Sequence, residues 1–476
     1  MNNRIEIKLI LSIAAVLLLP ISVCVGSGIS SSTVSASSAS GSETAVNVNT
    51  LNVEDLGKPL AKSAYARNVW DMQVYDGKVY LGYGNSSNTG PSPNAGPIPI
   101  VYYDPAASRF NTQEVAAAST KKMNKYVDEE QIDLYKIIKG KLYIPGHDPR
   151  GDSWDFGNFY RLDQDQWNKF RNIPNAIHVY DMASYHGNLF VGTSAKSSDV
   201  FVSKDDGNSW SKLAELHAFG AKRVYTLFEF KDTLYALGSL LPKNDKWSDE
   251  NKMLSIKGQT KHGSDKLVTE ELTVYGSKMF PGPEVHVKEN KPPYMRMVRT
   301  TVVGDRIVYI GGEVYNDHQW QSKGLFIAKD INDARRIGLP NGEAVPMDIL
   351  IRDNHIYVLA YVKSKPNVYT NLVYQAKVSE LDHDSAWSEI VRFPQETFAR
   401  SFEELDGSFY FGLGTDMDPI SESAGTILRV HERNNSGVPT LNSPVLEDSN
   451  KDDEQEKELT IWERLKQMVQ HMLGAM

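Results

Sequence analysis

Short apolar runs separated by turn residues recur along most of the chain. The clearest set is residues 178–213, where four runs rich in Val, Phe and Tyr are separated by Gly, Asp and Asn. The first two runs meet at Tyr185, His186 and Gly187, and the last two meet around Asp206. Runs of this length and composition are typical of strands joined by hairpins. We therefore predict one four-stranded antiparallel unit, with strands named A to D in chain order.

The A–B part of this unit recurs along the chain. Its signature is an aromatic residue, then Asp, a turn with Gly, and an apolar-aromatic-apolar-Gly tetrad. Copies begin at Val69, Ile132, Val179, Val224, Val298, Pro346 and Ala399. A period of about 45 to 53 residues with four strands per repeat is typical of a β-propeller blade. The sequence therefore predicts an all-β fold, a seven-bladed β-propeller of four-stranded antiparallel blades over residues 45–433.

The last repeat lacks a D strand. It ends with one further strand, TILRVHE from Thr426, and then continues as NNSGVPTLNSP. A propeller ring must close, and an unpaired strand edge promotes association with other chains. Residues 45–53, AVNVNTLNV, alternate apolar and polar positions as a strand does. We predict that the Val46–Val53 strand completes the seventh blade.

One polar position recurs in the A strands, which are otherwise apolar on both faces. The aligned column is Asp71, Leu134, Asp181, Thr226, Thr300, Asp348 and Ser401. Aspartates at one blade position could line the channel and bind a cation or another ligand. The interpretation we favour is that these side chains bond backbone groups of the adjacent blade, because buried polar groups need hydrogen-bond partners.

The C–D turn of the third repeat carries a second motif. Ser203, Asp205, Gly207, Ser209 and Trp210 fit the pattern S-x-D-x-G-x-[ST]-W. The Asp carboxylate can accept backbone N–H groups of the turn, and Gly can adopt a positive φ. The Trp offers a large apolar face to neighbouring strands. We expect this turn to stabilise the fold and to have no catalytic role.

This pattern resembles the Asp-box, the bacterial neuraminidase repeat. The chain is similar to secreted Asp-box propellers, a superfamily that includes sialidases. Sialidases also carry an (F/Y)-R-I-P segment, and the nearest match here is FRNIP at Phe170–Pro174, with Asn172 inserted. The resemblance thus implies a secreted propeller without the sialidase catalytic motifs, and no catalytic residue is assigned.

Long B–C connections indicate the binding face. B–C and D–A connections emerge on the same face of an antiparallel blade, and insertions on one face of a repeat array often mark a binding surface. The second-blade loop GHDPRGDSWDFGN is the densest polar and aromatic cluster. We expect it to border the top of the central channel near His178. The candidate ligand-binding residues are His147, Asp148, Arg150, Trp154, His178, Arg223, Arg299 and Arg400. For each one, the alternative is ordinary polar surface.

Two function classes follow from this face. Aromatic, Asp, His and Arg side chains together suit sugars, which need stacking surfaces and hydrogen bonds. The favoured hypothesis is a binding module for a glycan or a protein. The alternative is a glycan-active hydrolase or lyase in the central depression, but the sequence does not select a pair of carboxyl groups. No cofactor and no metal site are predicted. The net charge of −9 argues against nucleic acid as a partner.

The chain ends predict an extracellular or cell-surface location. An apolar run, Leu9–Val25, makes residues 1–26 a signal peptide or a membrane anchor, with lipidation at Cys24 as a further alternative. Residues 27–44 form a Ser-rich linker and residues 434–459 an acidic linker. Residues 460–476 have the spacing of an amphipathic helix. Its apolar stripe would dock on the propeller, bind a partner or lie on a membrane.

Overall fold

The computed structural model describes residues 51–60, 67–84, 97–149, 153, 155–194, 197–216, 223–240, 250–261, 264–282, 293–315, 319–415 and 421–432. The chain divides into two units, residues 1–46 and 47–476, and every described residue belongs to the second. The predicted N-terminal segment, both linkers and the C-terminal helix lie outside the described residues. Within the described part, no helix is both long and apolar enough to cross a membrane.

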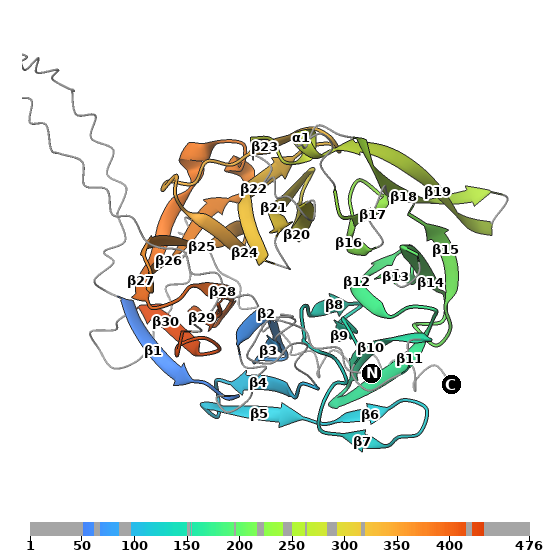
Figure 1. Cartoon of the computed structure of the whole chain (residues 1–476), viewed down its shortest axis with the longest axis horizontal. Helices are drawn as coiled ribbons and strands as arrows, with labels where there is room; N and C mark the ends of the chain where they lie inside the picture. Colours follow the sequence, from blue (N-terminus) through green and yellow to red (C-terminus); the bar gives the residue numbers. More distant parts are fainter. Residues whose placement is uncertain are drawn as a thin grey trace, which may run out of the picture. The chain divides into compact units, whose positions relative to one another are not determined.

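The described residues form seven sheets arranged around a central channel (Figure 1), which confirms the predicted seven-bladed propeller. The first blade contains β2 (Asn68–Tyr75), β3 (Lys78–Gly84), β4 (Ile100–Asp104) and β5 (Arg109–Gln113). The second contains β8 (Lys136–Ile138), β9 (Lys141–Pro145), β10 (Phe156–Asp163) and β11 (Gln166–Pro174). The third contains β12 (His178–Tyr185), β13 (Asn188–Ser194), β14 (Asp199–Ser203) and β15 (Ser211–Glu215).

The remaining four blades follow in chain order. The fourth contains β16 (Val224–Glu229), β17 (Leu234–Gly238), β18 (Glu250–Lys261) and β19 (Ser264–Tyr275). The fifth contains β20 (Tyr294–Val303), β21 (Arg306–Tyr315), β22 (Gln319–Ala328) and β23 (Ala334–Arg336). The sixth contains β24 (Val345–Arg352), β25 (His355–Lys365), β26 (Val368–Lys377) and β27 (Ser388–Gln395). The seventh contains β28 (Ala399–Leu405), β29 (Ser408–Leu413), β30 (Ile427–Glu432) and β1 (Leu51–Gly57). The described part of the chain also contains three short helical turns, α1 (Gly276–Met279), η2 (Val378–Glu380) and η3 (Asp384–Ala386).

The ring is closed by β1, the most N-terminal described strand, which pairs antiparallel with β30. A strand from the N-terminal part of the chain thus completes the seventh blade, as the sequence predicts. The predicted C-terminal bound, Val53, was wrong, because the strand extends to Gly57. The earlier residues of that segment lie outside the described part of the chain.

Two blades carry additions. In the second, β6 (Val115–Ala117) pairs parallel with β11, and β7 (Met123–Asn124) pairs with β6, so this sheet has six strands. These two short strands were not predicted from the sequence. In the fourth, β18 and β19 form a long hairpin that extends outward from the ring (Figure 1).

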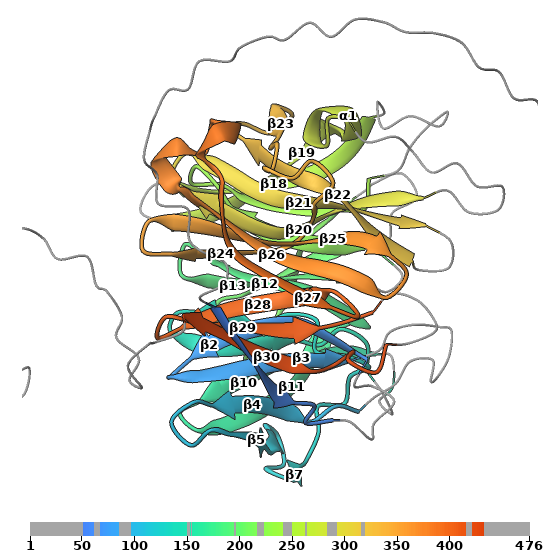
Figure 2. The same cartoon turned by 90° about the vertical axis from the view of Figure 1, so that its left-hand side faces the viewer.

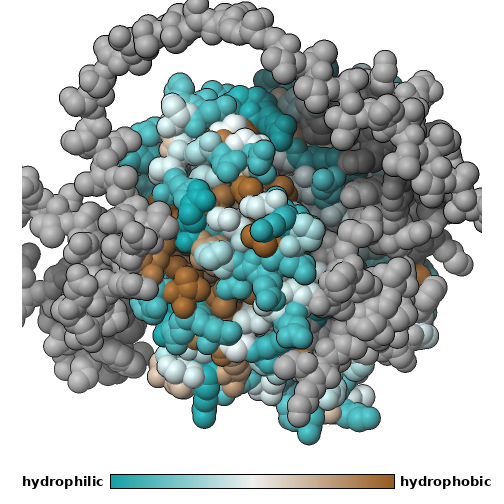
Figure 3. Space-filling view, turned by 60° about the vertical axis from the view of Figure 1, so that its left-hand side comes forward, coloured by the Kyte–Doolittle hydropathy of each residue, from teal (hydrophilic) through white to brown (hydrophobic). Residues whose placement is uncertain are grey.

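The apolar core lies within and between the blades. The A strands are largely buried on both faces, as in β12, whose burial accounts for the lack of simple alternation. Figure 2 shows the blades from the side. On the outer surface turned forward in Figure 3, hydrophilic residues predominate, and a smaller group of hydrophobic residues lies among them.

The C–D turn of the third blade is held by its own side chains. The Asp205 carboxylate accepts the Ser209 hydroxyl at 2.5 Å and the Ser209 backbone N–H at 2.8 Å, and these hydrogen bonds lower the pKa of Asp205 to about 2. The backbone N–H of Gly207 donates to the Ser203 hydroxyl at 2.8 Å. Gly207 has a φ of +90°, and a Cβ there would lie 2.7 Å from the Phe159 ring, so the turn requires Gly.

The recurring polar column joins neighbouring blades. Asp71 accepts the backbone N–H of Tyr135, and Asp181 accepts that of Leu227, at 2.7 and 2.8 Å. Asp348 does the same with the N–H of Phe402, at 3.2 Å. Each bond reaches the next blade in sequence. These bonds confirm the structural interpretation of the column.

One member of the predicted column is wrong. The Ser401 hydroxyl donates to the carbonyl of Val69, two residues before the column residue of its neighbour. The Thr226 hydroxyl donates in the same way to the carbonyl of Met297, which assigns the column position of the fifth blade to Arg299 rather than Thr300. The reason is local: the irregular pairing of β20 with β21 lies between Val298 and Thr301, and Arg299 has a φ of +52°.

Candidate functional site

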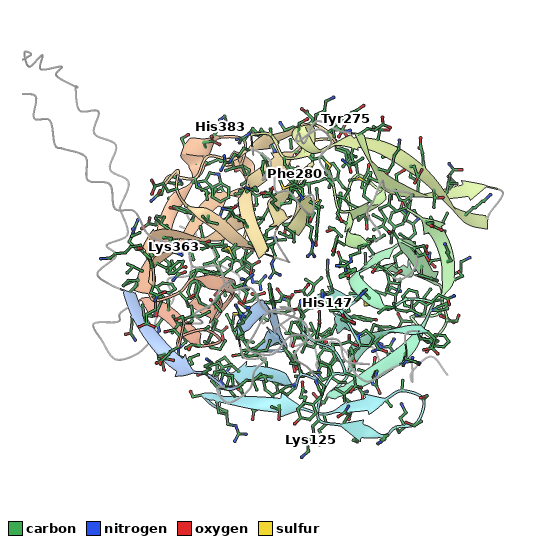
Figure 4. The ribbon with its side chains drawn as sticks, in the orientation of Figure 1. Lys125, His147, Tyr275, Phe280, Lys363 and His383 are labelled. Carbon is green, nitrogen blue, oxygen red and sulfur yellow. The ribbon has the colours of Figure 1, made fainter. Side chains whose placement is uncertain are left out.

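A cavity of about 500 Å³ occupies the central channel at the end formed by the B–C and D–A connections. Six of the eight predicted ligand-binding residues line it: His147, Asp148, His178, Arg223, Arg299 and Arg400. Figure 4 shows His147 at the inner rim of the ring. The other two, Arg150 and Trp154, lie outside the described residues. The described start of the second-blade loop, His147 and Asp148, therefore borders the channel together with His178.

The A strands present one further residue each to this cavity through a repeated bulge. Five A strands skip one residue in their pairing with the B strand. The skipped residues are Trp70, Tyr180, Tyr225, Met347 and Arg400, and all five line the cavity. A bulge redirects a side chain relative to the regular alternation of a strand. Each skipped residue immediately precedes the polar column.

Of these five residues, only Arg400 was predicted from the sequence. The signal for the others was present, because the aromatic residue of the repeat signature stands directly before the column residue. Trp70, Tyr180 and Tyr225 are those aromatics. In a regular strand, the column residue and the aromatic residue before it would lie on opposite faces. The bulge is what turns the aromatic residue toward the channel, and the sequence does not reveal the bulge.

Aromatic rings from three consecutive blades form one wall of the cavity. His178 stacks on Tyr180, with ring centroids 5.4 Å apart and planes 21° apart. Tyr180 contacts Tyr225 at 4.6 Å, and Tyr225 stacks on Tyr294 at 6.3 Å with an interplanar angle of 9°. Burial raises the pKa values of Tyr180 and Tyr294, so these phenols stay neutral. The wall offers flat apolar faces with hydroxyl groups at their edges.

Two guanidinium groups lie on this wall without a carboxylate partner among the described residues. Arg223 donates to the Tyr225 hydroxyl at 3.0 Å, and its guanidinium carbon lies 5.8 Å from the centroid of the Tyr180 ring. The guanidinium carbon of Arg296 lies 3.8 Å from the centroid of the Tyr225 ring. The Nε atom of Arg296 is buried and has no hydrogen-bond partner in the described part of the chain. Arg296 was not among the predicted site residues.

Trp70 of the first blade and Arg400 of the seventh blade face the cavity. The Arg400 guanidinium carbon lies 4.3 Å from the centroid of a Trp70 ring, and its Nε donates to Asn68 at 3.0 Å. The Trp70 indole N–H donates to the carbonyl of Gly84 at 3.2 Å. These contacts fix the orientation of the indole ring before any ligand is present.

Arg299 crosses the channel one residue deeper along the A strands. Its guanidinium donates to the Asp71 carboxylate and the Trp70 carbonyl, and its Nε lies 3.1 Å from Asp348. It therefore joins the fifth blade to the first and the sixth. Two carboxylates compensate its charge, so Arg299 offers little uncompensated positive charge to a ligand.

The two histidines of the cavity are uncharged at neutral pH. Burial lowers the pKa of His147 to about 4, although its ring nitrogens lie 3.5 Å from carboxylate oxygens of Glu130 and Asp133. Burial also lowers the pKa of His178, whose Nδ1 lies 2.8 Å from the carbonyl oxygen of His147. That distance assigns the Nδ1–H tautomer to His178, with Nε2 as an acceptor. Positive charge in the cavity therefore comes from arginine and from Lys136, whose Nζ lies 3.1 Å from a carboxylate oxygen of Asp181.

No metal site is formed by the part of the chain that the structure describes, where no three His, Cys, Asp or Glu side chains are grouped suitably. The pocket chemistry available there is stacking, hydrogen bonding and charge pairing.

Comparisons with known proteins assign no function to this chain. No protein-family model matches the chain, and no curated protein matches it. Among solved structures, it is similar to YCF48 bound to a D1 peptide, at 10% identity, 83% coverage of this chain, 99% of the other and a TM-score of 0.39. It is also similar to the Pan2 WD40 domain of Neurospora crassa, at 9% identity and a TM-score of 0.44. That match covers 80% of this chain and 96% of the other. The match to the sialidase of Trypanosoma rangeli has 12% identity and a TM-score of 0.32, and it covers 58% of this chain and 48% of the other. At these values, none of the three carries an argument about what this chain binds.

Proposed function

We propose that the protein is a secreted or surface-tethered binding module whose central pocket recognises an acidic glycan. The proposal rests on two guanidinium groups, those of Arg223 and Arg296. Neither one contacts a carboxylate among the described residues. The cell-surface location rests on the N-terminal apolar run and the C-terminal amphipathic pattern of the sequence.

These two arginines contrast with several others in the described part of the chain. Four arginines elsewhere each contact a carboxylate: Arg161, Arg306, Arg352 and Arg429. Removing a cation from water is costly unless an anion compensates it. A ligand carboxylate or sulfate would supply that anion, and guanidinium groups bind such oxygens through paired hydrogen bonds.

The aromatic wall favours a sugar over a flexible acidic peptide. Tyr180, Tyr225 and Trp70 present rings that can pack against the C–H face of a sugar, and the nearby hydroxyls and imidazoles can bond its hydroxyl groups. The cavity volume of about 500 Å³ lies in the range of small-ligand sites. Because Trp70 is already fixed by Gly84 and Arg400, little side-chain entropy is lost on binding.

The test compares acidic polysaccharides with their neutral counterparts. The full chain is applied to uronate-containing oligosaccharides and to the same oligosaccharides after carboxyl reduction. We expect binding to the acidic forms only. Arg223→Gln and Arg296→Gln should each weaken it by about 10-fold or more, because a hydrogen bond to a charged group contributes about 1.5 to 3 kcal/mol.

Arg392→Gln is the matched control. Arg392 pairs with Glu389 on β27, and it does not line the cavity. Equal binding of reduced and acidic oligosaccharides, or parental affinity of both pocket variants, would refute the proposal. Preference for acidic peptides would replace the glycan by a protein ligand. Following the same oligosaccharides for cleavage products tests the alternative of a glycan-active enzyme.

A further inference from the structure

The cavity has an acidic edge that the arginine pair does not occupy. This edge consists of Glu130, Asp133 and Asp148, which all line the cavity. Glu130 and Asp133 stand shortly before β8, and Asp148 stands shortly after β9. The backbone N–H of Glu130 donates to the carbonyl of Asp148 at 3.1 Å, so the two segments are joined directly. Three carboxyl groups are therefore held together at the side of the second blade.

His147 does not neutralise this edge. Its ring nitrogens lie 3.5 Å from carboxylate oxygens of Glu130 and Asp133, but burial lowers its pKa to about 4. A neutral imidazole carries one N–H and donates to only one of the two carboxyl groups. Within the described part of the chain, no Lys or Arg lies at ion-pair distance from Asp133, which contacts Gln131 and His147. Asp133 therefore offers its charge to a ligand.

Gln131 adds a hydrogen-bond acceptor to the same edge. Its side chain lines the cavity and is 2% exposed, and its amide nitrogen donates to Asp133 at 2.9 Å. That bond assigns the amide orientation, with Oε1 as the other terminal atom. The Oε1 atom is buried and receives no hydrogen bond from the described residues. A buried acceptor without a donor is costly, so a ligand that donates here gains affinity.

A primary ammonium group matches these requirements. It carries one positive charge and three N–H donors, whereas the edge presents carboxyl groups and an amide oxygen. Hydrogen bonds from an ammonium group to a carboxylate are about twice as strong as those between neutral groups. A metal ion fits less well, because no three His, Cys, Asp or Glu side chains of the described residues are grouped to hold one.

The aromatic wall connects the acidic edge to the arginine pair. His147 meets the Tyr180 ring edge-on at 5.2 Å, and Tyr180 contacts Tyr225 at 4.6 Å. The Arg296 guanidinium carbon lies 3.8 Å from the centroid of the Tyr225 ring. Two neighbouring rings thus separate the two charged regions. A ligand of two sugar units packed along these rings has one end at each region.

We propose that the ligand is a zwitterionic glycan, in which an acidic sugar is linked to a sugar with a free amine. The acid group binds Arg223 and Arg296, and the ammonium group binds Asp133 and Gln131 at the acidic edge. This inference rests on the proposed glycan function and adds a positive charge to the ligand. N-acetylation of the amino sugar removes that charge and two of its three donors.

The test compares two forms of one oligosaccharide, in which a uronic acid alternates with a 2-amino sugar. One form has free amines and the other is N-acetylated. Calorimetric titration of the full chain at about pH 6.5, where the amine is protonated, should show about 10-fold tighter binding of the free amine. Asp133→Asn should abolish this preference and leave the affinity for the acetylated form unchanged. Arg296→Gln should weaken the binding of both forms.

Asp76→Asn is the matched control. Asp76 is exposed in the β2–β3 turn, it does not line the cavity, and Asn is equally suited to its place before Gly77. This variant should keep the full preference for the free amine. Asp148→Asn is a second variant at the acidic edge and should lower the preference. Thermal unfolding of each variant shows whether the substitution has disturbed the fold.

The outcomes separate this inference from the proposed function. Equal affinity for the two forms, or a preference that survives in both Asp133→Asn and Asp148→Asn, overturns the inference. The proposed function still stands in that case if Arg296→Gln weakens the binding of both forms. Failure of both forms to bind the parent refutes the proposed function and the inference together.

Discussion

Single charged residues inside the ring differ in what compensates them. Arg299 meets Asp71 and Asp348, whereas Arg223 and Arg296 meet aromatic rings and no carboxylate in the described residues. The same side-chain type therefore has a structural role at one depth of the channel and offers a cationic edge to a ligand at another. Sequence alone treats Arg223 and Arg299 alike, because both stand near the start of an A strand. Only the shifted bulge of the fifth blade separates them.

Arg299→Ala should destabilise the propeller strongly. The substitution leaves Asp71 and Asp348 buried without their shared cation, and breaking a buried pair costs about 3 to 5 kcal/mol. The control is Arg335→Ala, which removes a more exposed pair with Asp384 and should cost less than about 1 kcal/mol. Urea unfolding followed by fluorescence gives both values. Similar losses for the two variants would show that Arg299 does not hold the blades together.

Glu129→Gln should stabilise the protein at neutral pH and not at acidic pH. Burial raises the pKa of Glu129 to about 8, although its carboxylate accepts hydrogen bonds from Asn158 and Tyr160. Because the folded state binds this proton more tightly than the unfolded state, stability falls as the pH rises from about 4.5 to 8. Glutamine mimics the neutral carboxyl group. The gain should be on the order of 4 kcal/mol at pH 7.5, from about three pH units at about 1.4 kcal/mol each, and vanish near pH 4. Thermal unfolding of variant and parent across this pH range measures the difference in stability. A difference that does not change with pH would contradict the raised pKa of Glu129.

At the scale of strands and turns, the prediction of the fold rested on the repeated sequence pattern. The tight turns and the apolar-aromatic runs that follow them locate all seven A–B hairpins, because each hairpin is specified by its own turn residues. Three features escaped this reasoning. The parallel β6–β11 pair joins distant segments, the bulges alter side-chain direction, and the fifth blade shifts its register. Each depends on contacts beyond the local pattern.

Tryptophans at the C–D turns of the second and third blades should differ in their contribution. Trp210 is half-buried and packs edge-on against Phe159, with centroids 5.8 Å apart. Trp167 is fully buried and donates to Gln113. Trp167→Ala should cost about 3 to 5 kcal/mol, and Trp210→Ala only about 2 to 3 kcal/mol. Denaturant unfolding measures both. An equal or reversed order would show that burial does not set the contribution of this turn.

Ring closure should depend on β1. Deleting residues 45–57 exposes the edge of β30 and removes the packing of Leu51 on the seventh blade. We expect loss of the cooperative unfolding transition or aggregation. Deleting residues 27–44 is the control and should leave the melting temperature unchanged within about 2 °C. A cooperative transition in the first variant at the parental temperature would exclude β1 as the closing strand.

At the scale of the whole molecule, the ring gathers residues that are far apart in sequence. Six predicted residues line one cavity, because all seven A strands point the same way along the channel. Arg296 and the bulged aromatics could not be chosen from loop composition, since they belong to strands. The ligand itself is not encoded in the repeat, and its chemistry is indicated only by the charges and the aromatic wall of the pocket.

The central claim is that Arg223 and Arg296 form an anion site. Crystals of the protein soaked in iodide, examined by anomalous scattering, test it whatever the natural ligand is. We expect an ordered iodide in contact with both guanidinium groups, and its loss in Arg296→Gln crystals. Ordered iodide elsewhere on the protein, with none between these two arginines, would contradict the claim.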